Sequence, residues 1–372
     1  MTSPDNAKID TPLKTRLIDM IALKGPITVA DYMTDALSHP NDGYYMSQPA
    51  IGADGDFTTA PEISQVFGEL IGLWLVDTWR AMGSPDDFNL IELGPGRGVL
   101  MEDILRAARL RRGFIDAADL WLVESSGRLR IEQQRRLRAS EVKPKWLDDF
   151  EMASPAPSLI IANEFFDCFP VRQFERTKAG WRERLVGNDA ATNELIFVLD
   201  TTPPPKALGL PEPTDVEIGA IYETSFAAQA YMKSLCERLR NDNGALLLID
   251  YGHMHSGLGE TLQAVRNHQF TSVLSAPGKA DITAHVDFEQ LSTIAIDNGL
   301  AVYGPVAQGE FLERLGLNIR VEMLAKSKSP EQAKAIRDGA YRIAAPNQMG
   351  EIFKVMVVTS PDLSAPAGFF DE

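Results

Sequence analysis

The sequence predicts an α/β fold in which a mostly parallel sheet carries helices on both faces. The apolar run at 88–93 leads into a glycine-rich turn at 94–98, after which apolar residues recur at helical spacing. Short apolar runs then alternate with helical patterns, as in sheets whose strands run parallel. The chain ends on two further strand patterns, at 300–306 and 351–359. These observations predict a ligand site where the strands end, because open α/β sheets bind ligands at that edge.

The first part of the chain, 1–86, is predicted to be helical apart from one loop. Amphipathic spacing predicts helices over 9–23 and 29–37. The stretch 39–61 is rich in Gly, Asp and Pro and predicts a loop. A long helix is expected to begin where that loop ends, at the Pro-Glu pair that suits a helix start. We expect this region to contain a loop that covers a cofactor.

The core of the fold is predicted in two parts, 87–170 and 224–360. Apolar runs predict its remaining strands near 88–93, 119–124, 144–147, 158–162 and 244–250. The second part also predicts helices over 224–241, 288–298 and 330–345, and an irregular insertion at 252–286. A flexible tail is expected at 361–372.

Residues 171–223 interrupt the core. Alternating apolar and polar residues predict a mainly antiparallel excursion, with turns near 179–180 and 187–189. The prolines from 203 to 213 then predict an extended connector. We therefore expect an insertion between the two parts of the core.

Composition excludes several classes of protein. With 36 Lys and Arg against 52 Asp and Glu, the net charge of −16 disfavours a nucleic-acid partner. Arginines gather in one stretch, which we interpret as solvated helix faces rather than a polyanion site: Arg106, Arg109, Arg111, Arg112, Arg128, Arg130, Arg135, Arg136 and Arg138. The two cysteines show no C-x-x-C spacing, so neither a disulfide framework nor a metal site is indicated.

The sequence contains no segment that predicts membrane insertion or export. The N-terminus lacks an apolar signal core and the Arg-rich character of an organelle presequence. The most apolar helix candidate, 70–76, falls short of the ~20 residues that span a bilayer. We expect a soluble cytoplasmic protein; its oligomeric state is not predicted.

The glycine turn separates classes of cofactor. A dinucleotide fingerprint requires G-x-G-x-x-G, but the position of its third glycine is Val99. A phosphate-binding P-loop is excluded because no Gly-Lys-Ser/Thr follows. The pattern E-x-G-x-G-x-G is instead typical of proteins that bind S-adenosylmethionine (SAM), and it comprises Glu92, Gly94, Gly96 and Gly98.

Acidic residues after the next two strands are candidates for the rest of a cofactor site. Glu124 can bind ribose hydroxyls through a carboxylate that accepts two hydrogen bonds, although it can also cap the following helix. Asp148 or Asp149 can accept from an adenine amino group, but helix capping or a surface role is equally compatible. In the loop before the long helix, Thr58 and Pro61 can lie over the cofactor, since helix N-terminal amides favour anions; a simple capping loop is the alternative.

The segment 163–170 suits a second, cationic ligand. Its acids Glu164 and Asp167 and the amide Asn163 stand beside three phenylalanines at a strand end. Carboxylates bind a guanidinium bidentately, and aromatic faces add cation–π attraction. The alternative is that the phenylalanines are core residues and the acids begin a helix.

One histidine is a candidate for proton transfer. His285 has an acid on either side in the segment 281–287, and an imidazole can accept a proton near neutral pH. An ordinary hydrogen-bonding role is equally compatible with a lone loop histidine. His253 and His255 have no third ligand at recognisable spacing, so we interpret them as loop residues rather than metal ligands.

Five ordered motifs resemble the MidA family of SAM-dependent methyltransferases. They are GDFTTAPE at 55–62, ELGPGRG at 92–98, NEFFD at 163–167, DYG at 250–252 and DITAH at 281–285. Mitochondrial members of this family are complex I assembly factors that methylate an arginine of a core subunit. The resemblance implies the seven-stranded, Rossmann-like class I methyltransferase sheet, SAM as cofactor and a protein arginine nitrogen as acceptor. We expect this chain to be a bacterial relative of the mitochondrial members, without their presequence.

The resemblance also implies roles for the candidate residues. Glu164, Asp167 and His285 would be catalytic, and the cofactor would be bound by Glu92, Gly94, Gly96, Gly98, Glu124, Asp148, Asp149, Asn163, Thr58 and Pro61. The partner would be a protein with an accessible arginine, such as a complex I subunit. Two alternatives stay open: a methyltransferase with a small-molecule or other protein acceptor, and a SAM-binding assembly factor without turnover.

Overall fold

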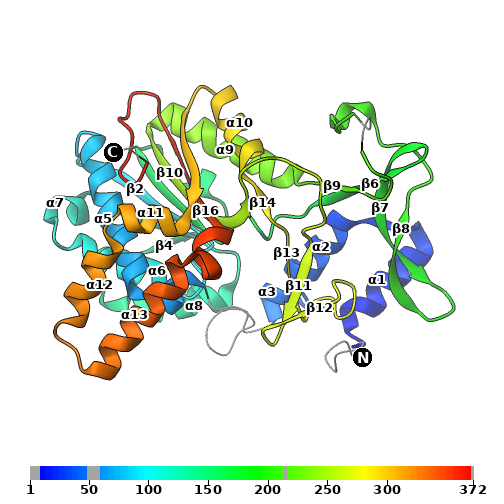
Figure 1. Cartoon of the computed structure of the whole chain (residues 1–372), viewed down its shortest axis with the longest axis horizontal. Coiled ribbons are helices and arrows are strands. Elements are labelled where there is room, and N and C mark those ends of the chain that lie inside the picture. The colour runs from blue at the N-terminus through cyan, green and yellow to red at the C-terminus, as the bar shows by residue number, and fades with distance from the viewer. Residues whose placement is uncertain (1–8, 48–58, 213–215, 370–372) are drawn as a thin grey trace.

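The computed structural model describes residues 9–47, 59–212 and 216–369. Its larger lobe is built on a sheet with the strand order β15-β16-β10-β5-β2-β3-β4 (Figure 1). The strands in chain order are β2 (Phe88–Leu93), β3 (Ala118–Val123), β4 (Lys145–Leu147), β5 (Ser158–Asn163), β10 (Gly244–His253), β15 (Ala301–Ala307) and β16 (Phe353–Thr359). The two-residue strand β14 (Val286–Asp287) also pairs with the end of β10.

The sheet is parallel except at one side. Strands β4, β3, β2, β5 and β10 run parallel to their neighbours, whereas β16 is antiparallel to both β10 and β15. Every predicted core strand is present, with bounds within three residues of the prediction. The predicted fold class is therefore confirmed.

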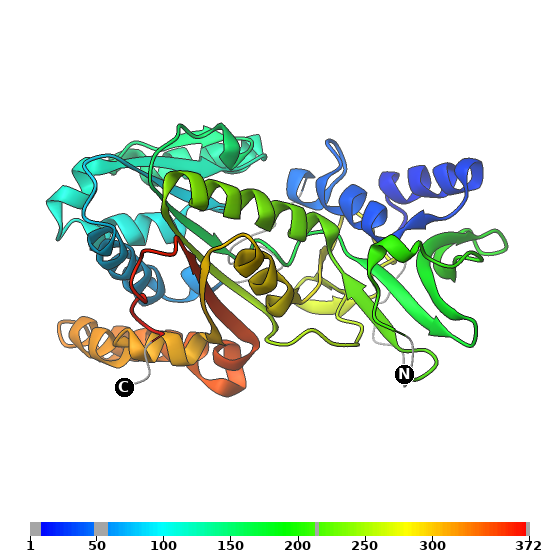
Figure 2. The same ribbon diagram turned by 90° about the horizontal axis from the view of Figure 1, so that it is seen from above.

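Helices cover both faces because the strands are apolar on both. Along β2, Phe88 and Leu90 enter one hydrophobic cluster, whereas Ile91 and Leu93 enter the other. The first cluster also receives α5 (Gln65–Ala81), α6 (Val99–Ala108) and α7 (Arg112–Ala117), and the second receives α9 (Phe226–Asp242) and α10 (Phe288–Asp297). Figure 2 shows these helices on opposite sides of the sheet. The arrangement leaves the carboxyl ends of the parallel strands open at one edge.

The long helix expected from residue 61 is divided in two. A short α4 (Ala60–Ile63) precedes α5, and Ser64 between them has an extended backbone with φ −148° and ψ 119°. The Ser64 amide still donates to the Ala60 carbonyl, so α4 is closed as a single turn. The prediction of one continuous helix was wrong because apolar spacing does not reveal a one-residue break.

The smaller lobe joins distant parts of the chain (Figure 1). It contains α1 (Pro12–Lys24), α2 (Val29–Ser38) and α3 (Tyr44–Ser47), with a sheet of β1 (Ile27–Thr28), β6 (Arg172–Thr177), β7 (Gly180–Asp189), β8 (Glu194–Leu199) and β9 (Ile221–Thr224). Strand β1 is antiparallel to β7, and side chains of the helices and of these strands share one core. The predicted antiparallel excursion is present, and the N-terminal helices pack on it.

Two details of the insertions differ from the prediction. The turn expected at 187–189 lies at 190–193, because β7 continues to Asp189 and its carboxylate then accepts from the Ala191 amide. The segment 252–286, expected to be irregular, contains a three-stranded sheet of β11 (Gln263–Arg266), β12 (Gln269–Thr271) and β13 (Asp281–Thr283). These strands are three or four residues long, too short for an alternation that the sequence would reveal.

Three helices connect the last two strands: α11 (Gln308–Arg314), α12 (Leu317–Ala325) and α13 (Pro330–Ala344). The sequence predicted α13 alone. Buried Glu69 of α5 joins this layer to the core, since it accepts hydrogen bonds from Arg106 at 3.1 Å and from Arg320 of α12 at 2.8 Å. Among the described residues, no helix is long and apolar enough to cross a membrane.

Replacing Glu69 with alanine is expected to lower the free energy of unfolding by about 1–3 kcal/mol, because Arg320 loses its carboxylate partner and Arg106 keeps only Asp103. Urea unfolding of the purified variant measures this change. Glu322→Ala is the matched control, because Glu322 pairs with Arg337 on the exposed face and should cost much less. Equal losses in the two variants would contradict a role for Glu69 in holding α12.

Candidate functional site

A cavity of about 290 Å³ lies at the carboxyl ends of β2, β3 and β5. The larger lobe contributes the glycine turn and the strand ends, while α2 and α3 of the smaller lobe contribute Leu37, Tyr45 and Met46. The charged side chains that line it are all acidic: Glu124, Asp148, Glu164, Asp167 and Asp281. Among the described residues no lysine or arginine lines this cavity, so it is suited to cations.

The glycine turn forms the floor of the cavity. Gly94, Gly96 and Gly98 have φ values of 60°, 51° and 78°, a left-handed conformation that side chains other than glycine rarely adopt. A Cβ atom on Gly94 would lie 2.8 Å from Cδ2 of Phe165, so the turn also needs glycine for space. Gly98 then caps the N-terminus of α6. Gly94 and Gly96 thus bring bare backbone to the cavity, while Gly98 allows the turn into the helix.

Glu124 is fixed beside this turn. Its Oε1 accepts from the Ser126 amide at 2.8 Å, and its Oε2 accepts from Nε2 of Gln133 at 3.2 Å. The same Gln133 nitrogen donates to the Gly96 carbonyl at 2.7 Å, which ties the carboxylate to the glycine turn. Burial raises the pKa of Glu124 above its ordinary value. The N-cap of α8 is Ser126 rather than Glu124, so Glu124 orders the turn before the helix while its side chain lines the cavity.

The two aspartates after β4 have different environments. Asp148 lines the cavity, and its carboxylate pairs with Arg130. Asp149 instead accepts from the Glu151 amide at 3.0 Å and caps the short 3₁₀-helix Phe150–Met152. This difference favours Asp148 as the residue that meets a cofactor base.

A smaller cavity of about 60 Å³ lies on the other side of the glycine turn. Glu92, Asn163, Pro61 and Arg97 line it together with Thr59. Oε2 of Glu92 and Oδ1 of Asn163 are buried, and neither has a hydrogen-bond partner among the described residues. Burial and the nearby Glu124 raise the pKa of Glu92 to about 8. Unpartnered oxygens beside an arginine fit the ammonium and carboxylate groups of an amino-acid moiety such as that of SAM. Thr58 lies outside the described residues.

The loop after β5 holds the two predicted catalytic acids. Oδ2 of Asp250 accepts from the backbone amides of Phe165, Phe166 and Asp167, at 3.1, 2.9 and 3.2 Å. Glu164 precedes these residues with φ 49°, a conformation that is strained for a residue with a side chain. Asp250 therefore positions the loop, a role that the sequence did not assign to it although it ends a predicted strand.

Glu164 and Asp167 both have perturbed acidity. Oε1 of Glu164 accepts from the Ala60 amide at 3.2 Å and from Nδ2 of Asn163 at 3.3 Å. Burial and the charge of Asp167 raise the pKa of Glu164 to about 8. Burial likewise raises the pKa of Asp167 above its ordinary value. Carboxyl groups titrating near neutral pH can exchange protons with a ligand.

Tyr45 and Asp281 both line the cavity, and the sequence analysis did not predict that they contact each other. The Tyr45 hydroxyl from α3 donates to Oδ1 of Asp281 in β13 at 2.9 Å. Because Asp281 is close to Glu164, its charge also contributes to the raised pKa of that glutamate. The contact joins residues 236 positions apart, so no local pattern could reveal it.

One phenylalanine of the loop is a core residue and another lines the cavity. Phe166 is buried in the second hydrophobic cluster, as the core alternative requires. Phe165 lines the cavity and packs against Tyr231, which also lines it, with ring centroids 5.4 Å apart. The cavity therefore has two aromatic walls beside its acids.

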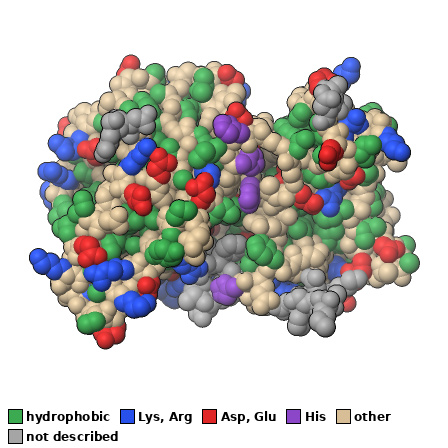
Figure 3. Space-filling model, in the orientation of Figure 1, with side chains coloured by type: hydrophobic (Ala, Val, Ile, Leu, Met, Phe, Trp, Pro, Cys, Tyr) green, Lys and Arg blue, Asp and Glu red, His purple; other side chains and the backbone are tan. Residues whose placement is uncertain are grey.

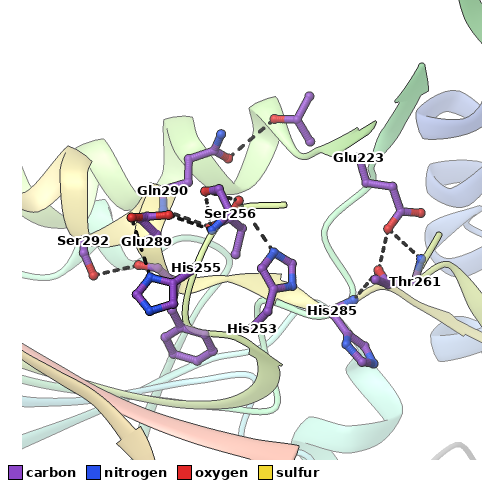
Figure 4. A network of polar contacts seen from close by, with 12 residues as sticks. Glu223, His253, His255, Ser256, Thr261, His285, Glu289, Gln290 and Ser292 are labelled. Carbon is purple, nitrogen blue, oxygen red and sulfur yellow. Dashed lines mark hydrogen bonds and ion pairs between the residues drawn. The ribbon is translucent and has the colours of Figure 1, made fainter. Parts of the chain in front are cut away.

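His285 does not line this cavity. It lines a separate space of about 40 Å³ with His253, and its ring meets Tyr251 edge-on at 5.6 Å between centroids. Its backbone amide donates to Thr261 (Figure 4). Burial and the charges of His253 and Lys354 lower the pKa of His285. The preceding residue, Ala284, donates its amide to the Asp167 carbonyl, but the His285 side chain lines the other space rather than the cavity that holds Glu164 and Asp167.

Two of the other histidines, His253 and His255, lie close to acidic residues. His253 lies 3.7 Å from Asp287 and His255 lies 3.8 Å from Glu289 (Figure 4). Figure 3 shows histidine side chains gathered along the boundary between the two lobes. In the described part of the chain, no group of three or more His, Cys, Asp or Glu side chains could hold a metal ion.

Comparisons with known proteins agree with this geometry. Residues 70–306 match the family model of S-adenosyl-L-methionine-dependent methyltransferases. The mitochondrial protein arginine methyltransferase NDUFAF7 homolog of Drosophila melanogaster is 36% identical over 95% of this chain and 86% of its own length. The mitochondrial protein arginine methyltransferase NDUFAF7 of Homo sapiens is 35% identical over 92% of this chain and 82% of its own length.

Solved structures share the fold. A Burkholderia thailandensis protein, crystallised with S-adenosyl-homocysteine, superposes with a TM-score of 0.83 and 24% identity over 98% of each chain. A second crystal structure from the same organism has a TM-score of 0.81 and 25% identity, also over 98% of each chain. The arrangement of both lobes is therefore common to these proteins.

Proposed function

We propose that this chain, which belongs to the family of S-adenosyl-L-methionine-dependent methyltransferases, methylates an arginine side chain of a protein substrate. The observation that carries the proposal is the cavity lined by five acids and by no described lysine or arginine. Relatives of this chain are named protein arginine methyltransferases, which supports the same acceptor. SAM supplies an electrophilic methyl group when it is bound.

The acids around the acceptor loop suit a guanidinium group. Glu164 and Asp167 line the cavity from the loop after β5, and Asp281 lines it from β13. Carboxylates bind a guanidinium through charge-assisted, often bidentate hydrogen bonds. We assign Glu164 and Asp167 to hold the acceptor, with Asp281 as a further acid on the same wall.

These residues also address the chemical difficulty of the reaction. An arginine side chain stays protonated at ordinary pH, so its nitrogens are poor nucleophiles. Hydrogen bonds from one nitrogen to Glu164 and Asp167 would orient the group, and orientation of two bound reactants can be worth ~7–11 kcal/mol. A carboxyl group with a raised pKa can then accept the released proton, which favours Glu164 over His285, because His285 does not line the cavity.

The affinity for an arginine peptide is expected to increase as pH rises from about 6 to 8. In the empty site the Glu164 carboxyl is largely protonated below its pKa of about 8, whereas the guanidinium is charged throughout. Binding a cation therefore releases a proton at low pH, and the affinity should rise by up to about tenfold per pH unit. The affinity for the arginine peptide is measured by calorimetry at each pH with S-adenosylhomocysteine present. This cofactor product lacks the sulfonium charge. Glu164→Gln should flatten the profile, and an equal slope in that variant would contradict the assignment.

A complex I subunit is the finer identity that we propose for the acceptor. The resemblance to the MidA family supports it, and the cytoplasmic location expected from the sequence stays a prediction. The alternatives are a small-molecule acceptor and a SAM-binding assembly factor without turnover.

The test is a transfer assay with labelled SAM on proteins from cells that lack this chain. Wild-type enzyme is expected to label a protein, and mass spectrometry should locate the methyl group on an arginine. Label on another side chain or on a small molecule would overturn the arginine assignment. Tight SAM binding without any labelled product would instead support the assembly factor.

A further inference from the structure

A furrow with an excess of arginine borders the cofactor site. It lies between α6 and the stretch formed by α8 (Gly127–Arg136) and the following 3₁₀-helix Leu137–Ala139. Its main part encloses about 730 Å³, and an adjoining hollow of about 190 Å³ shares Glu102 and Arg136 with it. We call both parts the basic furrow, which is lined by Arg97, Arg106, Arg109, Arg135, Arg136 and Arg138 against two acids, Glu102 and Glu132.

This charge is opposite to that of the whole protein. The segment 97–145 contains twelve basic and seven acidic residues, a net charge of +5, whereas the complete chain has −16. The remainder of the chain therefore has −21. A local reversal of this size creates a surface where an anion is attracted although the rest of the protein repels it.

Two arginines of the furrow are available to a ligand. Arg136 lies 2.9 Å from Glu102, and Arg97 lies 3.5 Å from Glu132, so these guanidinium groups already have acidic partners. Arg135 and Arg138 are exposed, and in the described ranges no carboxylate lies within 4 Å of either guanidinium group. Solvated charges without partners are the ones that an incoming carboxylate can pair with at least cost.

We propose that the basic furrow binds a short acidic segment of a partner protein. Its bases are all arginines, whose planar groups match carboxylates in pairs of hydrogen bonds. The site is a shallow, open hollow along two helical segments, and its few arginines suit a short peptide. The negative charge of the remainder disfavours a long polyanion such as nucleic acid.

The furrow is connected directly to the cofactor turn. Arg97 lines both the furrow and the small cavity beside Glu92, and Nε of Arg136 donates to the Arg97 carbonyl at 3.1 Å. A segment held in the furrow would therefore lie beside the cofactor turn. The partner is then the methyl acceptor itself, an identification that rests on the proposed function.

The test is fluorescence anisotropy with a labelled short peptide of alternating glutamate and glycine, which contains no arginine. Full-length protein is expected to bind it, and added NaCl should weaken binding because salt screens exposed charges. The double variant Arg135→Glu with Arg138→Glu should lose at least about tenfold in affinity. Lys178→Glu with Lys206→Glu changes the charge equally in the smaller lobe and should bind within about twofold of wild type. Unchanged SAM affinity by calorimetry shows that both variants are folded.

Three outcomes would overturn the proposal. The first is that the protein does not bind the peptide at low salt. The second is that the two double variants lose peptide affinity equally. The third is that the protein sediments with phosphatidylserine vesicles but does not bind the peptide. The last result would assign the furrow to a membrane. Because the peptide has no arginine, its binding is independent of methyl transfer, so failure of the arginine assignment and failure of the furrow are separate results.

Discussion

Replacing Glu164 with glutamine is expected to lower methyl transfer to arginine by about 100-fold or more, the usual effect of removing a catalytic acid or base. Glutamine has the same shape and can keep the hydrogen bond from the Ala60 amide, so the loop geometry should persist. What it removes is the negative charge that orients the guanidinium and the group that accepts the proton. The affinity for SAM should stay within about twofold, because the main cofactor residues are on the glycine turn and Glu124.

Initial rates with labelled SAM, and calorimetry for SAM itself, separate the two effects. Glu151→Gln is the control, because Glu151 is exposed on the short helix after β4 and does not line the cavity. It should leave both quantities unchanged. Near-normal turnover by Glu164→Gln with normal SAM affinity would refute the guanidinium assignment.

Replacing Gly96 with valine is expected to abolish SAM binding, with a loss of at least about 100-fold in affinity. Gly96 has φ 51°, which is strongly unfavourable for a β-branched side chain, and it lines both cavities of the site. Valine would strain the turn and fill the space where backbone now faces the ligand. Its carbonyl is also the acceptor for Gln133, so the connection to Glu124 would suffer.

Calorimetry with SAM and thermal unfolding without it test this variant. Gly127→Val is the control, because a Cβ there meets nothing within 4 Å and φ is not positive. The control should bind SAM normally. A folded Gly96→Val protein with wild-type affinity would show that the cofactor does not lie on this turn.

The parallel core was predictable because its strands are long apolar runs. In β10, nine of the ten residues are buried, and a run of that kind marks a central strand without any knowledge of its neighbours. The break at Ser64 and the short strands β11 to β13 depend on contacts with other elements. They therefore leave no pattern of sufficient length in the sequence.

The same distinction applies to the site. Glu124 and Glu164 could be predicted because they directly follow strands, and Asp167 because it lies in the short loop after β5; all three line the cavity. Asp250 ends the predicted strand, although β10 continues to His253, and its hydrogen bonds to three amides depend on how the neighbouring loop folds. His285 lines a different space, because flanking acids do not determine which way an imidazole points, and its catalytic role stays a prediction.

The shared core of the smaller lobe has a consequence for the order of events during synthesis. Helices α1 and α2 are synthesised early, yet they pack against β7, which is made about 150 residues later. Likewise, Tyr45 can bind Asp281 only after the chain has grown by 236 positions. Contacts so distant in sequence are slow to form. Helices α1 and α2 therefore lack their packing partners while the parallel sheet forms. We expect the contact between Tyr45 and Asp281, which completes the acceptor site, to form late. Chaperones would have their longest opportunity to bind at residues 12–38.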